Sequence, residues 1–180
     1  MHMRPFSYLL LTLAVALSLS TAVSASAPSE YDVKAAFIYN FMKFVEWPKD
    51  SFGDDTSGFI VGIIGTTQFG ECVSDLVANK TVSGRKITVR ENVAQDDMTS
   101  CHLVFFEQSE DSRTKELLAT LKGTAVLTVG ESEIFAQEGG IIRFVIHENK
   151  VRFTVSLPPA EEAGLKLSAK LLKVALEVKK

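Results

Sequence analysis

The sequence predicts a single three-layer α/β domain with a mainly parallel sheet and an antiparallel hairpin near its C-terminus. Short apolar runs alternate with amphipathic stretches along most of the chain, which is typical of strands joined by crossover helices. Near the end, two alternating segments, 141–147 and 151–157, flank a polar tripeptide, as in a β-hairpin. The length of 180 residues suits one domain.

The first 27 residues have the features of a secretory signal peptide, which leaves residues 28–180 as the mature domain. Arg4 precedes the apolar run 8–19, and small residues suited to cleavage follow at 23–27. The apolar run is shorter than the roughly 20 residues that a membrane span needs. An uncleaved N-terminal anchor is the alternative. The sequence therefore predicts an exported protein.

The charge of the chain excludes nucleic acid as a partner. The net charge is −3, and it becomes −4 when Arg4 leaves with the signal peptide. No block of basic residues interrupts this mildly acidic sequence. Nucleic-acid binding depends on clustered lysine and arginine, so this class of function is not expected.

Residues 31–48 form the most distinctive stretch and predict the first helix of the mature domain. Ser29 and Asp32 have the spacing of a capping box, with Ser29 at the N-cap. The helix is expected to run to about Trp47, because Pro48 prevents its continuation.

The apolar arc of this helix is wider than that of an ordinary surface helix. Its apolar residues span nearly 180° at 100° per residue, whereas about 100° is usual. The helix is therefore expected to be covered from two directions, by its own sheet and by either a neighbouring helix or a partner protein. Under the second interpretation, Phe37, Phe41 and Trp47 are candidate partner-binding residues.

The remaining elements follow from hydrophobic periodicity. Strands are expected at 59–64, 86–90, 102–106, 125–129, 141–147 and 151–157, and helices at 68–79, at 112–122 and from Pro158 onward, with a loop or short helix at 130–139. The last helix is amphipathic, with a stripe formed by Leu167, Leu171, Val174 and Val178. It is expected to pack on the sheet, and a membrane-surface helix is the alternative.

The two cysteines, Cys72 and Cys101, are expected to form a disulfide because the protein is exported. The loop between them would stabilise the fold by roughly 3–4 kcal/mol in the chain-entropy model. The alternative is a pair of buried free thiols, since Cys72 lies on the apolar face of a predicted helix.

Catalysis, metal binding and cofactor binding have little support in the sequence. The mature chain contains two histidines, His102 and His147, and neither has the spacing of a metal-binding motif. The G-x-S-x-G and C-x-x-C motifs are both absent. We therefore expect no enzyme, no cofactor and no metal site.

Loops at the carboxyl ends of the predicted strands are candidates for binding a small polar ligand. In open α/β sheets the binding crevice lies at that edge. The candidate residues are Gly65, Thr66, Thr67, Glu107, Ser109, Glu131 and Ser132. The alternative is that these loops are ordinary strand-to-helix turns.

Several blocks of the sequence resemble the YfiR-like periplasmic proteins. VKAAFIYNFMKFVEWP at 33–48 resembles the opening signature of that family. Further similar blocks are GRKITVR at 84–90, CHLVFF at 101–106, VLTVG at 126–130, FAQEGGIIRFV at 135–145 and VRFTVSLPPAEEAGLKLSAKLLKV at 151–174. They occur in the family's order and cover essentially the whole mature chain.

This resemblance implies a periplasmic regulator that represses an inner-membrane diguanylate cyclase by binding its periplasmic sensor region. Cyclic di-GMP signalling and biofilm formation would be the output, and an outer-membrane lipoprotein would relieve the repression. Many relatives neighbour other membrane sensors, so another such sensor is an alternative target. A small-molecule sensor or binding protein without a cyclase target is the other functional alternative.

The resemblance also implies a homodimer and a disulfide between Cys72 and Cys101. The second disulfide of the better known family type would lie near residues 141–157. That segment contains no cysteine here.

Overall fold

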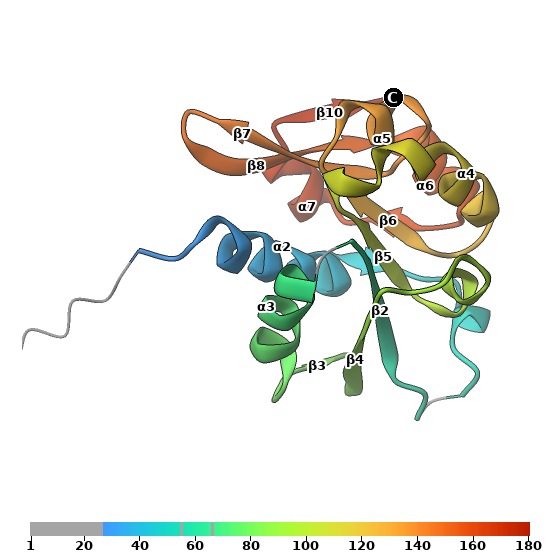
Figure 1. Ribbon diagram of the computed structural model, residues 1–180. Helices are drawn as coiled ribbons and strands as arrows, with labels where there is room; N and C mark the ends of the chain where they lie inside the picture. Colours follow the sequence, from blue (N-terminus) through green and yellow to red (C-terminus); the bar gives the residue numbers. More distant parts are fainter. Residues whose placement is uncertain (1–26, 55, 66) are drawn as a thin grey trace, which may run out of the picture.

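An eight-stranded sheet runs through the middle of the molecule, with helices on both of its faces (Figure 1). The computed structural model describes residues 27–180 except 55 and 66. In spatial order the strands are β10 (Glu177–Lys179), β8 (Lys150–Ser156), β7 (Ile142–His147), β6 (Leu127–Gly130), β5 (Leu103–Phe106), β2 (Phe59–Ile64), β4 (Arg85–Glu91) and β3 (Thr81–Val82).

The strand directions confirm the predicted fold class. Strands β4, β2, β5, β6 and β7 are parallel, and β7 and β8 form the predicted antiparallel hairpin. The short strand β3 pairs antiparallel with β4, and β10 lies parallel to β8 at the other edge. Apolar runs such as 59–64 become strands that are covered on both faces, as parallel strands require.

Two apolar clusters fill the spaces above and below the sheet. On one face, α2 (Glu30–Phe44), α3 (Thr67–Val77) and α7 (Ala169–Val174) contribute to the larger cluster. On the other face, α4 (Asp111–Leu121), α5 (Glu133–Gln137) and the 3-10 helix η2 (Gln95–Ser100) contribute to the second. Further elements are α6 (Leu157–Glu162), β1 (Val45–Glu46), β9 (Lys166–Leu167), η1 (Lys49–Ser51) and η3 (Gln108–Glu110).

The first helix begins as the sequence predicts but ends three residues earlier. The Ser29 hydroxyl accepts a hydrogen bond from the Asp32 backbone N–H at 3.1 Å, and the Asp32 carboxylate accepts one from the Ser29 N–H at 2.8 Å. The capping box is therefore confirmed. The helix ends at Phe44 rather than near Trp47, because β1 leaves it to pair antiparallel with β9.

The wide apolar arc of α2 is covered within the domain. Phe41 is 0% exposed, and its ring lies 5.0 Å from that of Phe153, centroid to centroid. Phe37 also packs on Phe153, at 5.4 Å. The indole N–H of Trp47 donates to the His102 carbonyl at 3.1 Å. Internal cover is thus confirmed, and the assignment of Phe41 as a partner-binding residue is wrong. Phe37 and Trp47 remain partly exposed.

The predicted continuous helix after Pro158 is wrong. The chain instead forms α6, β9, α7 and β10 in succession. Gly164 adopts a φ of +69°, a left-handed conformation that follows the end of α6. Ser168 then caps α7 by accepting from the Leu171 N–H at 3.3 Å. The last residues join the edge of the sheet because β10 supplies backbone hydrogen bonds to β8.

The predicted disulfide does not form, and both cysteines are free thiols. Cys72 lies on α3 and packs against the cluster that α2 covers, whereas Cys101 belongs to the cluster on the opposite face. The sheet separates them, so a bridge would require the fold to rearrange. Burial raises the pKa of both thiols; nearby Asp32 adds to this effect at Cys72.

Candidate functional site

Three of the predicted binding loops meet at one end of the sheet. Gly65 follows β2, Glu107 follows β5 and Glu131 follows β6, and these strands are parallel neighbours. The chain places β4 on one side of β2 and β5 on the other. Such a reversal of strand order marks the usual ligand crevice of an open α/β sheet.

Glu107 lies at the centre of this crevice and is buried. It accepts hydrogen bonds from the hydroxyls of Tyr31, at 3.4 Å, and Ser109, at 3.2 Å. Gly65 has a φ of +130°, and a Cβ at this position would lie 2.4 Å from a Glu107 carboxylate oxygen. Close backbone approach therefore requires glycine here. Burial and the adjacent Glu107 raise the pKa of Tyr31.

Lys34 of α2 connects the first helix to the end of β6. Its side chain is 7% exposed, and its ammonium lies 2.5 Å from Glu131 and also pairs with Glu30. Burial disfavours the charged ammonium. The hydrogen bonds to Glu131 and Glu30 outweigh that effect, so the pKa of Lys34 is raised.

The crevice is thus filled by the protein's own first helix. Of the remaining predicted ligand residues, Ser132 caps α5 by accepting from the Phe135 N–H at 3.1 Å. Thr67 is the first residue of α3. Thr66 lies outside the described residues.

Tyr31 and Lys34 are not among the residues that the sequence predicts for this cluster. A signal for Lys34 was present, because at 100° per residue it falls in the middle of the apolar arc, between Phe41 and Val45. A lysine in that position predicts a buried cation that needs an acidic partner. The identity of the partner depends on the fold.

An open groove of about 310 Å³ remains beside this cluster. Glu30, Lys34, Gln108 and Glu131 line one part of it, and residues 143–146 of β7 line the other. The groove offers carboxylates and cations together with the backbone of a strand. It lies next to the predicted binding loops that follow β5 and β6.

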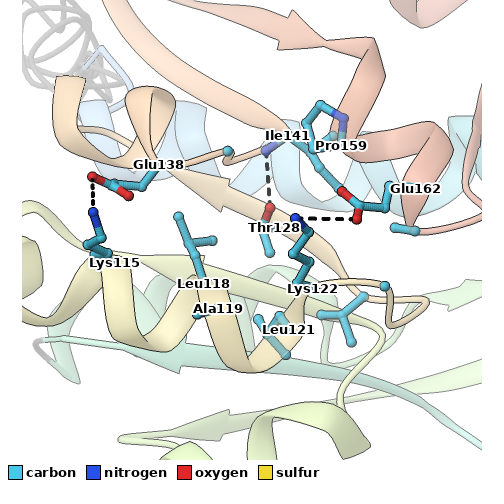
Figure 2. A pocket seen from close by; sticks show the side chains of 14 residues that line it. Lys115, Leu118, Ala119, Leu121, Lys122, Thr128, Glu138, Ile141, Pro159 and Glu162 are labelled. Atoms are coloured by element: carbon cyan, nitrogen blue, oxygen red, sulfur yellow. Dashed lines mark hydrogen bonds and ion pairs between the residues drawn. The ribbon is translucent and has the colours of Figure 1, made fainter.

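A second cleft, of about 250 Å³, lies between α4, α6 and the turn before β7 (Figure 2). Its floor is apolar and includes Leu118, Leu121 and Ile141. Figure 2 shows two ion pairs at its rim, Lys115 with Glu138 at 3.3 Å and Lys122 with Glu162 at 3.6 Å. These exposed pairs stabilise the rim only weakly.

The two histidines have different environments. His102 is buried: its Nδ1 accepts from the Ile60 N–H at 3.1 Å, and its Nε2–H donates to the Ser51 carbonyl at 3.1 Å. Burial lowers its pKa. These contacts give His102 a structural role between β2 and η1. His147 is exposed at the end of β7.

The fold and the strand-end cluster define a three-layer α/β domain whose first helix is anchored in the crevice of its own sheet. The chain belongs to the YfiR/HmsC-like family (DUF4154), whose model matches residues 31–176. The YfiR-like proteins of this family are regulators in cyclic di-GMP signalling. Within the described residues, no helix is long and apolar enough to cross a membrane.

Solved structures share the fold at low sequence identity. A conserved domain protein from Vibrio cholerae is 12% identical with a TM-score of 0.55, over 86% of this chain and 62% of that one. The ABC domain from Streptococcus pneumonia, solved in complex with L-Trp, is 9% identical with a TM-score of 0.52, over 83% of this chain and 60% of that one. The chain thus spans about three fifths of each structure. No curated protein matches it significantly in sequence.

Proposed function

We propose that this protein represses an inner-membrane diguanylate cyclase by binding the periplasmic sensor region of that enzyme. The family match over residues 31–176 carries the proposal, because it includes nearly all of the described domain. Residues 1–27 would direct the chain to the periplasm as a signal peptide, and residues 28–180 would form the working domain. An outer-membrane lipoprotein that competes for the repressor would relieve the repression.

Repression of this kind works by shifting a population. The protein binds the inactive conformation of the cyclase more tightly than the active one. Changing the cyclase from almost fully active to almost fully inactive requires a differential affinity of about 5.5 kcal/mol. Because binding takes place at the surface of the protein, the residues that contact the cyclase must be exposed. Phe37 and Trp47 retain partial exposure and stay candidates, whereas buried Phe41 does not.

Deletion of the gene tests this function in the cell. Cyclic di-GMP and biofilm should rise, and the full-length chain should restore the original levels. A chain without residues 1–27 should not restore them, because it stays on the wrong side of the membrane. Unchanged cyclic di-GMP after deletion would contradict repression, and full restoration by the shortened chain would contradict the periplasmic site of action.

Purified components test the partner and the oligomeric state. The recombinant periplasmic domain of the cyclase should bind the mature chain in calorimetry. Light scattering should give the mass of a homodimer. If the domain does not bind at any accessible concentration, the proposed partner is wrong; a monomer would refute the dimer alone.

A second candidate function is that of a periplasmic small-molecule sensor. The two clefts, of about 250 and 310 Å³, favour it, as does the shared fold with an ABC domain that was solved with L-Trp. Thermal-shift measurements with amino acids and nucleotides provide the test. A reproducible, saturable rise in melting temperature would support this function, and a flat response to every compound would count against it.

A further inference from the structure

Strand β7 is longer than β6, the strand that pairs with it on the side away from β8. Its ladder with β6 ends at the pair Gly130–Arg143. Its ladder with β8 continues four residues further, to the pair His147–Lys150. Figure 1 shows the hairpin of β7 and β8 projecting beyond the end of β6. One edge of β7 is therefore without a neighbouring strand in the described part of the chain.

The register of the hairpin shows which backbone groups lie on that edge. Glu148 and Asn149 have φ values of 50° and 56°, which is typical of a two-residue turn. In such a hairpin the closing pair His147–Lys150 exchanges hydrogen bonds, and so does every second pair after it. Phe144 and Ile146 belong to the intervening pairs, which exchange no hydrogen bonds. The carbonyls of both residues, and the N–H of Ile146, therefore point away from β8.

The space beside this edge is open. It is the groove of about 310 Å³ described above, and residues 143–146 form its wall. Glu131 follows the end of β6, and Gln108, Glu30 and Lys34 also line the groove. Ile146 is 57% exposed, although its partner across the hairpin, Val151, is partly buried. An apolar side chain thus stands next to unpaired backbone groups.

We propose that this edge of β7 binds an extended segment of a partner protein, which adds a strand to the sheet in line with β6. Backbone hydrogen bonds to Phe144 and Ile146 would give affinity, as in other cases of strand addition. An apolar side chain of the segment would cover Ile146. The charged groups that line the groove already pair with one another or with Glu133, so uncharged polar residues would flank that apolar residue in the segment. This inference rests on the proposed function, because it assigns the surface that receives the partner.

The register rules out a second copy of this hairpin that pairs antiparallel with Phe144 opposite Ile146. If two copies paired antiparallel with Phe144 opposite Ile146, His147 of one copy would lie opposite Arg143 of the other. Gly130 already occupies that position beside Arg143. The two chains would overlap there, whereas a single extended segment can stop short of Glu131.

Proline substitutions on the two edges of the same hairpin test the proposal. Ile146→Pro removes an outward N–H on the groove side without removing a bond of the β7–β8 ladder. Val151→Pro is the matched control, because Val151 lies opposite Ile146 and directs its N–H to the other edge, beyond the pairing of β10 with residues 154–156. Circular dichroism should show that both variants fold. Ile146→Lys and Val151→Lys form a second pair that retains the N–H.

Binding of the recombinant periplasmic domain of the cyclase should weaken about tenfold in Ile146→Pro, as expected for the loss of one or two hydrogen bonds, and less than twofold in Val151→Pro. Equal affinities for the wild type and both Ile146 variants would overturn the inference while leaving the proposed function intact.

A random decapeptide library displayed on phage gives a test that does not depend on the cyclase. Selection against the mature chain should enrich peptides whose binding is lost in Ile146→Pro and retained in Val151→Pro. If no enriched peptide depends on Ile146, the edge is not a strand-addition site. If such peptides are found but the cyclase domain does not bind, the inference holds and the proposed partner fails.

Discussion

Replacing Lys34 by methionine should destabilise the protein by about 3 kcal/mol. Breaking a fully buried ion pair costs roughly 3–5 kcal/mol, because the remaining charge is left without a partner. The side chain of Glu131 is 15% exposed, so water can solvate part of its carboxylate, and the lower end of that range applies. Glu30 is 52% exposed and adds little to the cost.

Urea unfolding followed by the fluorescence of Trp47, the single tryptophan, measures this change. Lys43→Met is the matched control, because Lys43 is exposed on the same helix and its loss should cost less than about 0.5 kcal/mol. The double variant Lys34→Met/Glu131→Gln should recover at least about 1 kcal/mol, since it removes the unpaired carboxylate. A cost below about 1 kcal/mol for Lys34→Met, or strictly additive effects in the double variant, would refute the argument that this pair anchors α2.

Three further predictions follow from the packing. Phe41→Ala should destabilise by about 4 kcal/mol in the same unfolding experiment, because it leaves a cavity in the core; a loss below 1 kcal/mol would contradict its burial. Burial lowers the folded-state pKa of His102 below the ordinary 6.5. The neutral side chain therefore makes its full contribution to the free energy of unfolding above pH 6.5, and this contribution is lost as the pH falls through the folded-state pKa. The melting temperature should therefore fall more steeply on acidification in the wild type than in His102→Gln, and identical profiles would contradict this. Cys72 and Cys101 should both react with a thiol reagent after unfolding without reductant. If neither reacts, the two cysteines form a disulfide, which would contradict their separation by the sheet.

The periodic spacing of apolar residues was sufficient to locate most of the helices and strands. The run at 59–64 became β2 with the same bounds, and the alternating segments after 141 became the β7–β8 hairpin. Ser29 and Asp32 formed the capping box that their spacing predicts. These features depend on residues close together in the chain, so their patterns report them directly.

The candidate site was only partly predictable. Glu107 and Glu131 were expected at the ends of neighbouring strands, because parallel topology brings such ends to one edge. Their partners on α2, Tyr31 and Lys34, are more than 70 residues away in the sequence. A helix has many directions in which it can cross a sheet, and the periodicity of its residues does not select one. The crevice therefore looked open in the sequence, whereas the structure closes it.

The sequence by itself determined the α/β class, the order of most strands and helices, and membership of the family. The tertiary structure alone decided which face of the sheet each element covers. This separated Cys72 from Cys101, buried Phe41, and divided the C-terminal segment so that β10 could join the sheet edge. The physical reason is that local patterns state how much of a residue must be buried. Long-range backbone pairing and packing decide against which neighbour it is buried.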